Sequence, residues 1–329
     1  MAGAFLCALR LAGNNDGLVV TTNPPFLGFA AALVKWLRRK PYVNIVHDVY
    51  PDTAVSAGLI RRSSLVTFLW ERITRLILRA ATANVVIGRD METLVRKKLG
   101  PRYRGQVVLI PNWADPKIAP ISHDRNDFRR EHNPQGHFLI QYSGTMARIH
   151  NVEPLVEAAA LLQDQPILFQ FIGEGFKKPL AQKMVQDLGL TNVQFLPFQP
   201  EERLAKVLSA ADLAAVCLAP EFTGSSVPSK SYGVMAAGVP ILGLLEPESE
   251  IGLTIKETDC GLVIPQASGQ AVAEAIKALS ANPERCKQMG ENGRRAYEQR
   301  FTLEFAAAQF DRLFRNVFLE RTGQGLNRR

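Results

Sequence analysis

The sequence predicts an α/β fold made of two Rossmann-like domains that face each other across a cleft. Short apolar segments alternate with amphipathic helical segments along the chain, which is the pattern of parallel α/β architecture. The alternation stops at residues 111–136, a stretch rich in Pro, Asn, Asp and His, and then begins again. The length of 329 residues also suits two domains.

The first half predicts four strands joined by three helices. Its start, residues 1–13, is apolar but interrupted by Arg10, with no positive charge before the apolar core. We therefore interpret it as the end of a Rossmann-type helix and not as a signal peptide. We place the first domain at residues 1–112. The strands are expected at 17–22, 42–46, 83–87 and 106–110, and the helices at 26–38, 63–80 and 90–99.

The second half repeats the same order, and we place the second domain at residues 113–301. A final helix at 303–319 has apolar residues on more than one side, so residues 302–329 are expected to pack back onto the first domain. Strands are expected at 138–142, 167–172, 193–195, 213–217, 240–244 and 261–264, and helices at 152–162, 178–188, 200–209, 228–237, 269–281 and 283–300.

Composition excludes several classes of protein. The four cysteines are scattered and form no CxxC pair, which argues against a zinc site or a disulfide framework and favours a reducing cytoplasm. No segment reaches the 18 or so apolar residues of a membrane-spanning helix. We expect a cytoplasmic protein without a structural metal.

The net charge of +8 is confined to one segment. Residues 61–104 contain eleven Lys/Arg and three Asp/Glu, whereas the rest of the chain has 28 of each sign. Such a patch points to an anionic membrane face, nucleic acid or a phosphorylated substrate. We expect no nucleic-acid binding, because aromatic residues for base stacking are not interleaved with the charges. The helix at 63–80 has a basic side and an apolar side, compatible either with a membrane surface or with ordinary packing on a sheet.

Ligands of open α/β sheets bind beyond the carboxyl ends of the strands, and two glycine turns stand at such positions in the second half. The turn in YSGTMARIHN offers a flexible backbone and basic groups for a diphosphate, and the alternative is a simple turn with solvated side chains. The turn in FIGEGFKK is half of a GxGxxG pattern, and the alternative is a glycine turn with surface lysines. The candidate residues are Gly144, Thr145, Arg148, His150, Gly173, Glu174 and Lys177.

Two further junctions carry candidate residues. In EFTGSSVPSKSYG, hydroxyl groups precede a helix that we expect to begin at Pro228 and Ser229, which predicts an anion site; ordinary capping is the alternative. In NIVHDVYPD, a buried strand delivers a His and an Asp that can orient a sugar hydroxyl or share a proton, although a lone His is commonly structural. The candidates here are Ser225, Ser226, Ser229, Lys230 and Gly233, together with His47 and Asp48.

In series, these segments resemble the retaining glycosyltransferases of family 4, which have the two-domain GT-B fold. The resemblance covers nearly all of the second half, from YSGTMARIHNVEPLVEAA to SVPSKSYGVMAAGVPIL, while IPNWAD and TNPPFLGFAAALV resemble the branch that builds colanic acid and related polysaccharides. It implies that residues 144–150 and 225–233 bind a donor diphosphate and that His47 contacts the donor sugar. It also implies a UDP- or GDP-linked sugar as donor and no metal or other cofactor. The acceptor would be either a glycan or a molecule linked to a polyprenyl diphosphate, and it would bind to the first domain. Residues 61–104 of that domain would face an anionic membrane.

The chain departs from the family pattern in three ways. Two glutamates common in the family align with Ser225 and Gly233, and the Arg and Lys of the diphosphate loop align with Thr145 and His150, so Lys230 and Arg148 are expected to supply that charge. The first strand and its Gly-rich loop have no counterpart, so we expect an incomplete, N-terminally truncated first domain. Two alternatives stay open: a degenerate nucleotide-sugar-binding protein and a nucleotide-sugar 2-epimerase.

Overall fold

The computed structural model describes residues 17–319 and divides the chain into two compact units. Of the described residues, unit 1 comprises 17–111, 222–227 and 304–319, and unit 2 comprises 112–221 and 228–303. The segment Phe222–Val227, which the sequence assigned to the second domain, is thus part of unit 1. The helix end interpreted from residues 1–13 lies outside the described residues.

Unit 1 contains a parallel four-stranded sheet in the order β1-β2-β3-β4. Each strand is joined to its neighbour by a helical crossover, as βαβ topology requires. Its elements are β1 (Leu18–Thr21), α2 (Leu27–Arg38), β2 (Tyr42–Val46), α3 (Asp52–Ser56), α4 (Leu65–Ala80), β3 (Ala83–Val86), α5 (Arg89–Leu99), β4 (Gln106–Leu109), α14 (Leu303–Phe314) and a π-helical turn at Arg315–Leu319.

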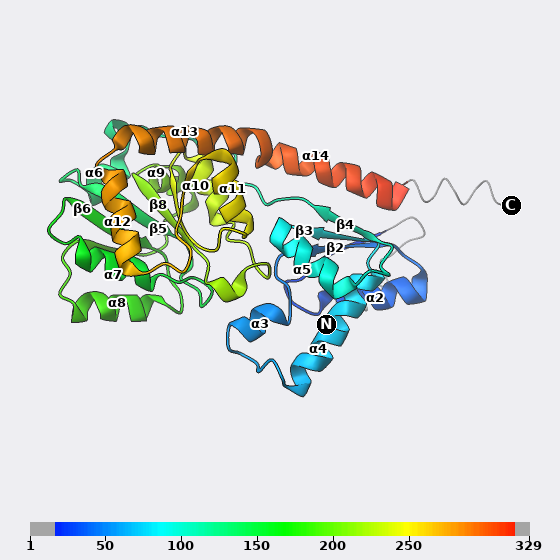
Figure 1. The fold of residues 1–329 in the computed structure, drawn as a ribbon. Helices are drawn as coiled ribbons and strands as arrows, with labels where there is room; N and C mark the ends of the chain where they lie inside the picture. The colour runs from blue at the N-terminus through cyan, green and yellow to red at the C-terminus, as the bar shows by residue number, and fades with distance from the viewer. Residues whose placement is uncertain (1–16, 320–329) are drawn as a thin grey trace. The chain divides into compact units, whose positions relative to one another are not determined.

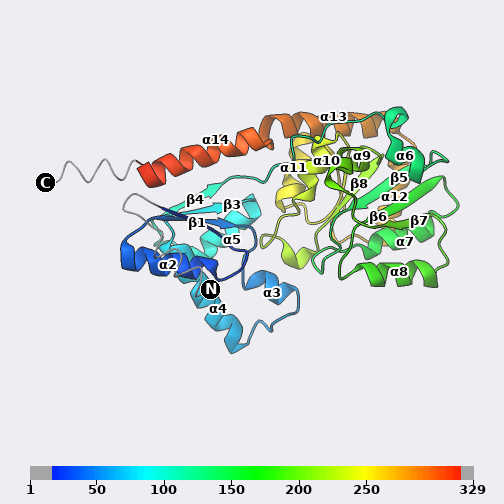
Figure 2. The same cartoon turned by 180° about the vertical axis from the view of Figure 1, so that it is seen from behind.

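Both faces of this sheet are covered, which explains why its strands are apolar on both sides. Val43 and Val85 pack with Ala306 and Leu313 of α14, whereas Tyr42 on the other face packs with α2. The opposite views in Figures 1 and 2 both place α14 on one side of the sheet and α2 and α4 on the other. The last helix therefore packs on the first sheet, as its apolar pattern predicts.

Unit 2 contains a parallel six-stranded sheet in the order β10-β9-β8-β5-β6-β7. Its strands are β5 (Phe138–Ser143), β6 (Ile167–Ile172), β7 (Val193–Leu196), β8 (Leu213–Cys217), β9 (Ile241–Leu244) and β10 (Gly261–Val263). Its α-helices are α6 (Asp127–His132), α7 (Glu153–Leu161), α8 (Lys178–Asp187), α9 (Leu204–Leu208), α10 (Lys230–Ala236), α11 (Glu250–Thr258), α12 (Gly269–Ser280) and α13 (Pro283–Arg300), with short 3₁₀ turns at His123–Arg125, Glu201–Arg203 and Pro220–Phe222.

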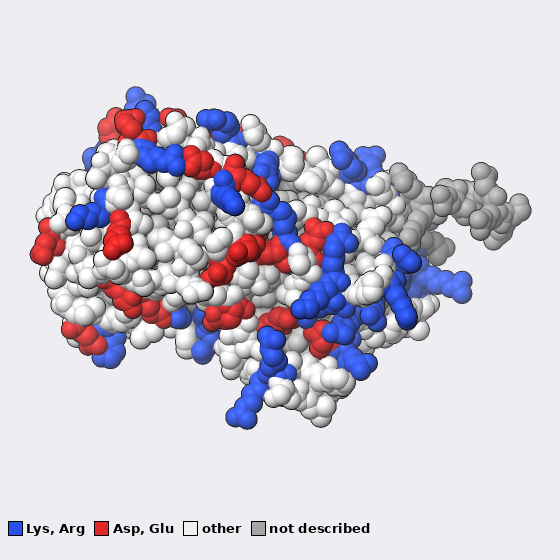
Figure 3. Space-filling view, in the orientation of Figure 1, with Lys and Arg blue, Asp and Glu red and all other residues white. Residues whose placement is uncertain are grey.

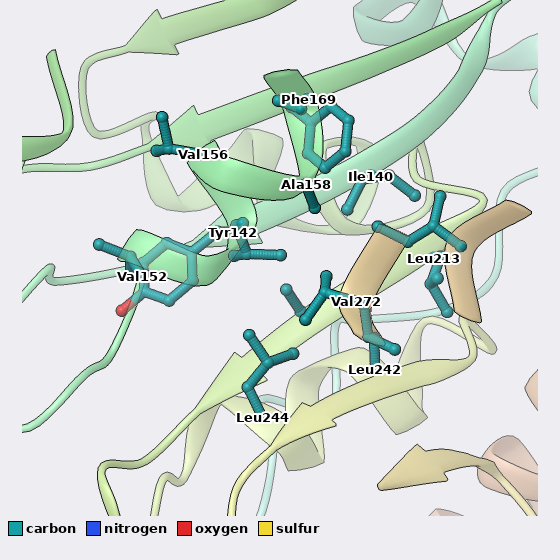
Figure 4. Close-up of a cluster of buried hydrophobic side chains, with 14 of the residues drawn as sticks. Ile140, Tyr142, Val152, Val156, Ala158, Phe169, Leu213, Leu242, Leu244 and Val272 are labelled. Atoms are coloured by element: carbon teal, nitrogen blue, oxygen red, sulfur yellow. The ribbon is translucent and has the colours of Figure 1, made fainter. Parts of the chain in front are cut away.

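The core of unit 2 lies on both faces of its sheet. On one face, side chains of β5, β6, β8 and β9 converge on α7 and α12, as Figure 4 shows for Ile140, Phe169, Leu242 and Val272. On the other face, Leu139 packs with Phe128 of α6 and with Val207 of α9. The α/β class with two parallel-sheet domains is therefore confirmed.

Three helices were not predicted from the sequence: α3, α6 and α11. Helix α6 lies within residues 111–136, which we expected to be an irregular connection. It forms because Asn126 caps it, accepting a hydrogen bond from the Arg129 amide at 3.1 Å, and because Phe128 is fully buried in the core. Helix α11 begins in the same way, with the Ser249 hydroxyl accepting from the Gly252 amide at 3.2 Å. Among residues 17–319, no helix has the length and apolar character needed to cross a bilayer.

Candidate functional site

Two glycine turns lie side by side at the carboxyl end of the unit 2 sheet. Gly144 follows β5 and Gly173 follows the neighbouring β6, with φ values of +129° and +128° that favour glycine. A Cβ on Gly173 would collide with the carbonyl oxygen of Gly144, and one on Gly175 would lie 2.5 Å from the carbonyl oxygen of Met146. The Met146 amide donates to the carbonyl of Glu174 at 2.8 Å. The glycines are therefore needed for the two turns to pack against each other.

Lys230 brings a cation to this pair of turns. Its Nζ donates a hydrogen bond to the Tyr142 hydroxyl at 2.5 Å and lies 3.8 Å from the centre of the Tyr142 ring. The Tyr142 hydroxyl in turn donates to the carbonyl of Thr145 at 2.8 Å. A Cβ on Gly144 would be 3.7 Å from Lys230 Nζ, so the ammonium lies directly beside the turn at Gly144. Within the described residues, Lys230 makes no ion pair with a carboxylate.

The surroundings perturb the protonation of two groups in this cluster. Burial lowers the pKa of Lys230 from 10.5 to about 8. Burial and the nearby Lys230 charge lower the pKa of His150 to about 3, and its Nδ1 accepts a hydrogen bond from the Ala147 amide at 3.3 Å. His150 is thus neutral near pH 7 and orders the turn, so it does not replace the family's basic residue at this position. Lys230 is the cation of the cluster.

The other charged candidates on these turns already have partners. Lys177 forms an ion pair with Glu153, and Glu174 forms one with Lys178 at 2.6 Å. The exposed Arg148 guanidinium stacks on the ring of Phe176, 3.3 Å from its centre. The sequence placed these residues near the turns, but it could not indicate that Lys177 and Glu174 would be neutralised by neighbours.

The start of α10 differs from the prediction. The helix begins at Lys230 and has seven residues, and Ser229 is exposed and makes no side-chain cap. Gly233 lies inside the helix, where a Cβ would be 3.3 Å from Leu208. The ordinary side-chain capping that was the alternative is therefore absent, and the helix begins two residues later than the expected start at Pro228, while the anion site stays a prediction. What this segment contributes to the turns is the Lys230 side chain.

In unit 1, His47 and Asp48 stand at the carboxyl end of β2. The backbone amides of both residues donate to the hydroxyl of Thr22, at 3.0 and 3.2 Å, and Thr22 follows the adjacent β1. The pKa of Asp48 is raised by burial, an effect opposed by a hydrogen bond from Ser226 and by the neighbouring His47. Sequence reasoning missed Thr22, although its place one residue after β1 was a signal of the same kind as that of His47 after β2.

The serines expected to bind an anion instead fix segment 222–227 to unit 1. The Ser225 hydroxyl donates to the carbonyl of Phe222 at 3.0 Å, and the Ser225 carbonyl accepts from the Val49 amide at 2.8 Å. Ser226 forms an antiparallel bridge with Asp48. Both serines are buried, and the Ser225 hydroxyl is committed locally rather than open to a ligand. Among residues 17–319, no cluster of three His, Cys, Asp or Glu offers a metal site.

Known protein families match both halves of the chain. The model of the family described as "Glycosyl transferases group 1" matches residues 124–296, and that of the "Glycosyl transferase 4-like domain" matches residues 5–113. The chain is similar to the probable glycosyltransferase WbjE of Pseudomonas aeruginosa, with 31% identity over 84% of this chain and 70% of that protein. It is also similar to the putative colanic acid biosynthesis glycosyl transferase WcaI of Escherichia coli strain K12. The identity is 30%, and the matched region covers 53% of this chain and 44% of that relative.

Solved structures share the fold at lower sequence identity. Anabaena Alr3699/HepE in complex with UDP aligns with a TM-score of 0.76 and 17% identity, over 96% of this chain and 81% of that one. Sucrose-phosphate synthase from Thermosynechococcus elongatus aligns with a TM-score of 0.73 and 21% identity, over 92% and 73% of the two chains.

Proposed function

This chain belongs to the family of group 1 glycosyl transferases, and on that premise we propose that it transfers a sugar, with retention of configuration, from a UDP- or GDP-linked donor to a lipid-linked or growing polysaccharide acceptor. The polysaccharide acceptor is supported by the relative named for colanic acid biosynthesis. The nucleotide-sugar donor is supported by HepE, which was solved with UDP and with UDP-glucose. The buried, free cysteines Cys217, Cys260 and Cys286 suit the cytoplasmic location that we propose.

The observation that carries the proposal is the Lys230 ammonium beside Gly144. A diphosphate needs a positive charge and a backbone that it can approach closely. In the described structure, Lys230 offers the charge and the turn at Gly144 offers the backbone. The ammonium is desolvated enough to have a pKa of about 8, and its hydrogen-bond partner, Tyr142, is neutral. An anion that reaches Lys230 would therefore meet a charge that no carboxylate has cancelled, in surroundings where electrostatic attraction is weakly screened.

The proposed chemistry is stabilisation of the departing diphosphate. As the bond between the sugar carbon and the phosphate oxygen breaks, negative charge grows on the diphosphate, and Lys230 stabilises it. The leaving phosphate accepts the proton of the acceptor hydroxyl as that hydroxyl bonds to the same face of the sugar. Gly144, Thr145 and Gly173 supply the backbone around the phosphates, and His47 and Asp48 are proposed contacts of the donor sugar. Lys177 and Glu174 are not assigned to the phosphates, because each is paired.

Nucleotide binding tests this proposal directly. We expect UDP or GDP, and the matching nucleotide-sugar, to bind the full chain and to raise its melting temperature in proportion to ligand concentration. Titration calorimetry with UDP, GDP and a panel of their sugars measures the affinity, and release of free nucleotide on addition of a lipid-linked acceptor measures transfer. Nucleotide binding without release would favour the degenerate binding protein. If neither UDP nor GDP bound, the proposal would be wrong.

A further inference from the structure

A cavity of about 630 Å³ lies at the edge of the unit 1 sheet where its strands begin. Thr82 and Gly105, which line it, come directly before β3 and β4. Because the strands are parallel, this amino edge lies opposite the carboxyl edge, where His47 and Asp48 stand. The volume is typical of sites that hold small molecules, which span about 300–1,000 Å³. None of the residues proposed for sugar transfer lines this cavity.

Every charged side chain in the described lining of this cavity is basic. We call the four cations the amino-edge cluster, defined as Lys35, Arg79, Arg102 and Arg104. Of the five acidic residues in 17–111, four follow β2 or β3, and Glu71 is paired with Lys98 at 2.6 Å. Figure 3 shows Lys and Arg gathered over unit 1, whereas acidic and basic side chains alternate over unit 2. The charges of the cluster therefore add to one another, and no carboxylate of the described lining cancels them.

Two cations of the amino-edge cluster are held by the ends of helices. Lys35 Nζ donates a hydrogen bond to the carbonyl of Ala80, the last residue of α4, at 2.7 Å. The Arg79 guanidinium donates to the carbonyl of Leu99, the last residue of α5, at 3.2 Å. Ordinary capping of helix ends explains both contacts. A carbonyl oxygen carries only a partial charge, so these contacts fix the two side chains and leave most of their charge to attract an anion.

Capping does not explain Arg102 and Arg104. Both residues are exposed, and neither side chain makes a hydrogen bond or an ion pair with another described residue. The loop that carries them is nevertheless fixed, because the hydroxyl of Tyr103 accepts a hydrogen bond from the Asn84 amide at 3.0 Å. Gly105 leaves room for this arrangement, since a Cβ there would collide with the Tyr103 ring. The two arginines are therefore kept beside the cavity by an anchored residue between them.

We propose that the amino-edge cluster binds a soluble compound with two or more phosphate groups, at a site separate from the donor site. Three of its four cations are arginines, whose planar guanidinium groups pair with phosphate oxygens. A terminal phosphate carries a charge of about −1.5 to −2 near pH 7, so two such groups balance four cations. Nucleoside polyphosphates and inorganic oligophosphates share this chemistry. The proposal rests on unit 1 alone and does not depend on the proposed sugar transfer.

Titration calorimetry with inorganic tripolyphosphate tests the proposal. The full chain carrying Lys230→Met is used throughout, so that the proposed donor-site cation contributes nothing, and we expect this protein to bind tripolyphosphate. Adding Arg102→Gln/Arg104→Gln should weaken the binding about tenfold or more, because half of the cluster is lost. The matched control adds Arg61→Gln/Arg62→Gln, which removes the same charge from exposed arginines of unit 1 outside the cavity and should change the affinity by no more than about twofold.

Chemical modification of arginines by phenylglyoxal, mapped by mass spectrometry, locates the bound anion. Tripolyphosphate should protect Arg102 and Arg104 and leave Arg61 and Arg62 as reactive as before. Tighter binding of UTP or ATP than of tripolyphosphate would identify the source of the phosphates as a nucleotide, and equal or weaker binding would identify it as an oligophosphate.

Three results would overturn the proposal. An equal loss of affinity in the two double variants would mean that net charge alone attracts the anion. Unchanged reactivity of Arg102 and Arg104 in the presence of bound tripolyphosphate would place the ligand elsewhere. If neither tripolyphosphate nor a nucleoside triphosphate bound the Lys230→Met protein, the cluster would serve only helix capping and solubility. Binding of UDP or GDP to the unaltered protein stays a separate measurement, so failure here leaves the proposed function standing.

Discussion

Replacing Lys230 by methionine is expected to lower kcat/KM for sugar transfer by about a hundredfold or more, because the residue that we propose to stabilise the leaving diphosphate loses its charge. Methionine keeps the length and much of the volume of the side chain, so the change is mainly electrostatic. Affinity for the free nucleotide diphosphate should fall as well, since the charge on the diphosphate is already present in the ground state. Nucleotide release under single-turnover conditions and titration calorimetry measure the two effects.

The same variant should be more stable than the unaltered protein near neutral pH. The pKa of Lys230 is about 8 in the folded state and 10.5 when unperturbed, so folding penalises its charged form. The penalty is full below pH 8, because the lysine is protonated in both states, and it fades between pH 8 and 10.5. We expect the methionine variant to gain about 1 kcal/mol or more in free energy of unfolding at pH 7 and to lose this advantage above about pH 10.5. Urea denaturation across this pH range measures the difference.

Controls separate the charge of Lys230 from other effects. Lys183→Met removes a lysine that is exposed and paired with Asp187, at 2.8 Å, and should change neither activity nor nucleotide affinity. Tyr142→Phe removes the hydroxyl that holds the ammonium and should have a smaller effect than loss of the ammonium itself. If Lys230→Met bound nucleotide and turned over like the unaltered protein, the diphosphate would have to bind elsewhere.

The strands were the most predictable part of the fold. The bounds of β2, β6 and β8 were predicted to the residue, because each is a short, mainly apolar run; β2 is followed by His47 and β6 by Gly173, whereas β8 is followed by Leu218. Helix α6 escaped prediction because it is short and polar, and its formation depends on burying Phe128 in a cluster that includes Leu168 and Val207, which are distant in sequence. A local pattern cannot reveal such a contact, since tertiary packing overrides weak helix propensity.

The glycine turns of the candidate site were predictable, and the states of their charged neighbours were not. Gly144 and Gly173 follow strands, a position that the sequence shows directly. The pairing of Lys177 with Glu153 joins residues 24 positions apart, and the neutrality of His150 follows from its burial, so both require the folded chain. The role of Tyr142 could not be predicted, because its place in an apolar strand indicates a core residue. The hydrogen bond from Lys230 to its hydroxyl forms only in the folded chain.

Replacing Gly173 by alanine is expected to destabilise unit 2 by about 3 kcal/mol or more, because two penalties add. Its φ of +128° is one that L residues with a side chain rarely adopt, and the new Cβ would collide with the carbonyl oxygen of Gly144. Neither turn can move away easily, because each is held by a backbone hydrogen bond. The Gly144 amide donates to the Ile172 carbonyl at 2.9 Å, and the Gly173 amide donates to the Leu196 carbonyl at 2.9 Å. Urea denaturation measures the loss of stability, and calorimetry measures the accompanying loss of nucleotide affinity as the two turns move apart.

The matched control for this substitution is Gly189→Ala. Gly189 also has a positive φ, +62°, but a Cβ there would meet nothing within 4 Å. It should therefore show the backbone penalty alone, about 1 kcal/mol, with nucleotide affinity unchanged. The difference between the two variants therefore contains the collision between the turns together with the larger backbone penalty at a φ of +128°. An equal loss of free energy of unfolding in the two variants would mean that the turn after β6 can move away from Gly144. Gly173 would then be needed only for its backbone conformation, and not for the packing that places Gly144 beside Lys230.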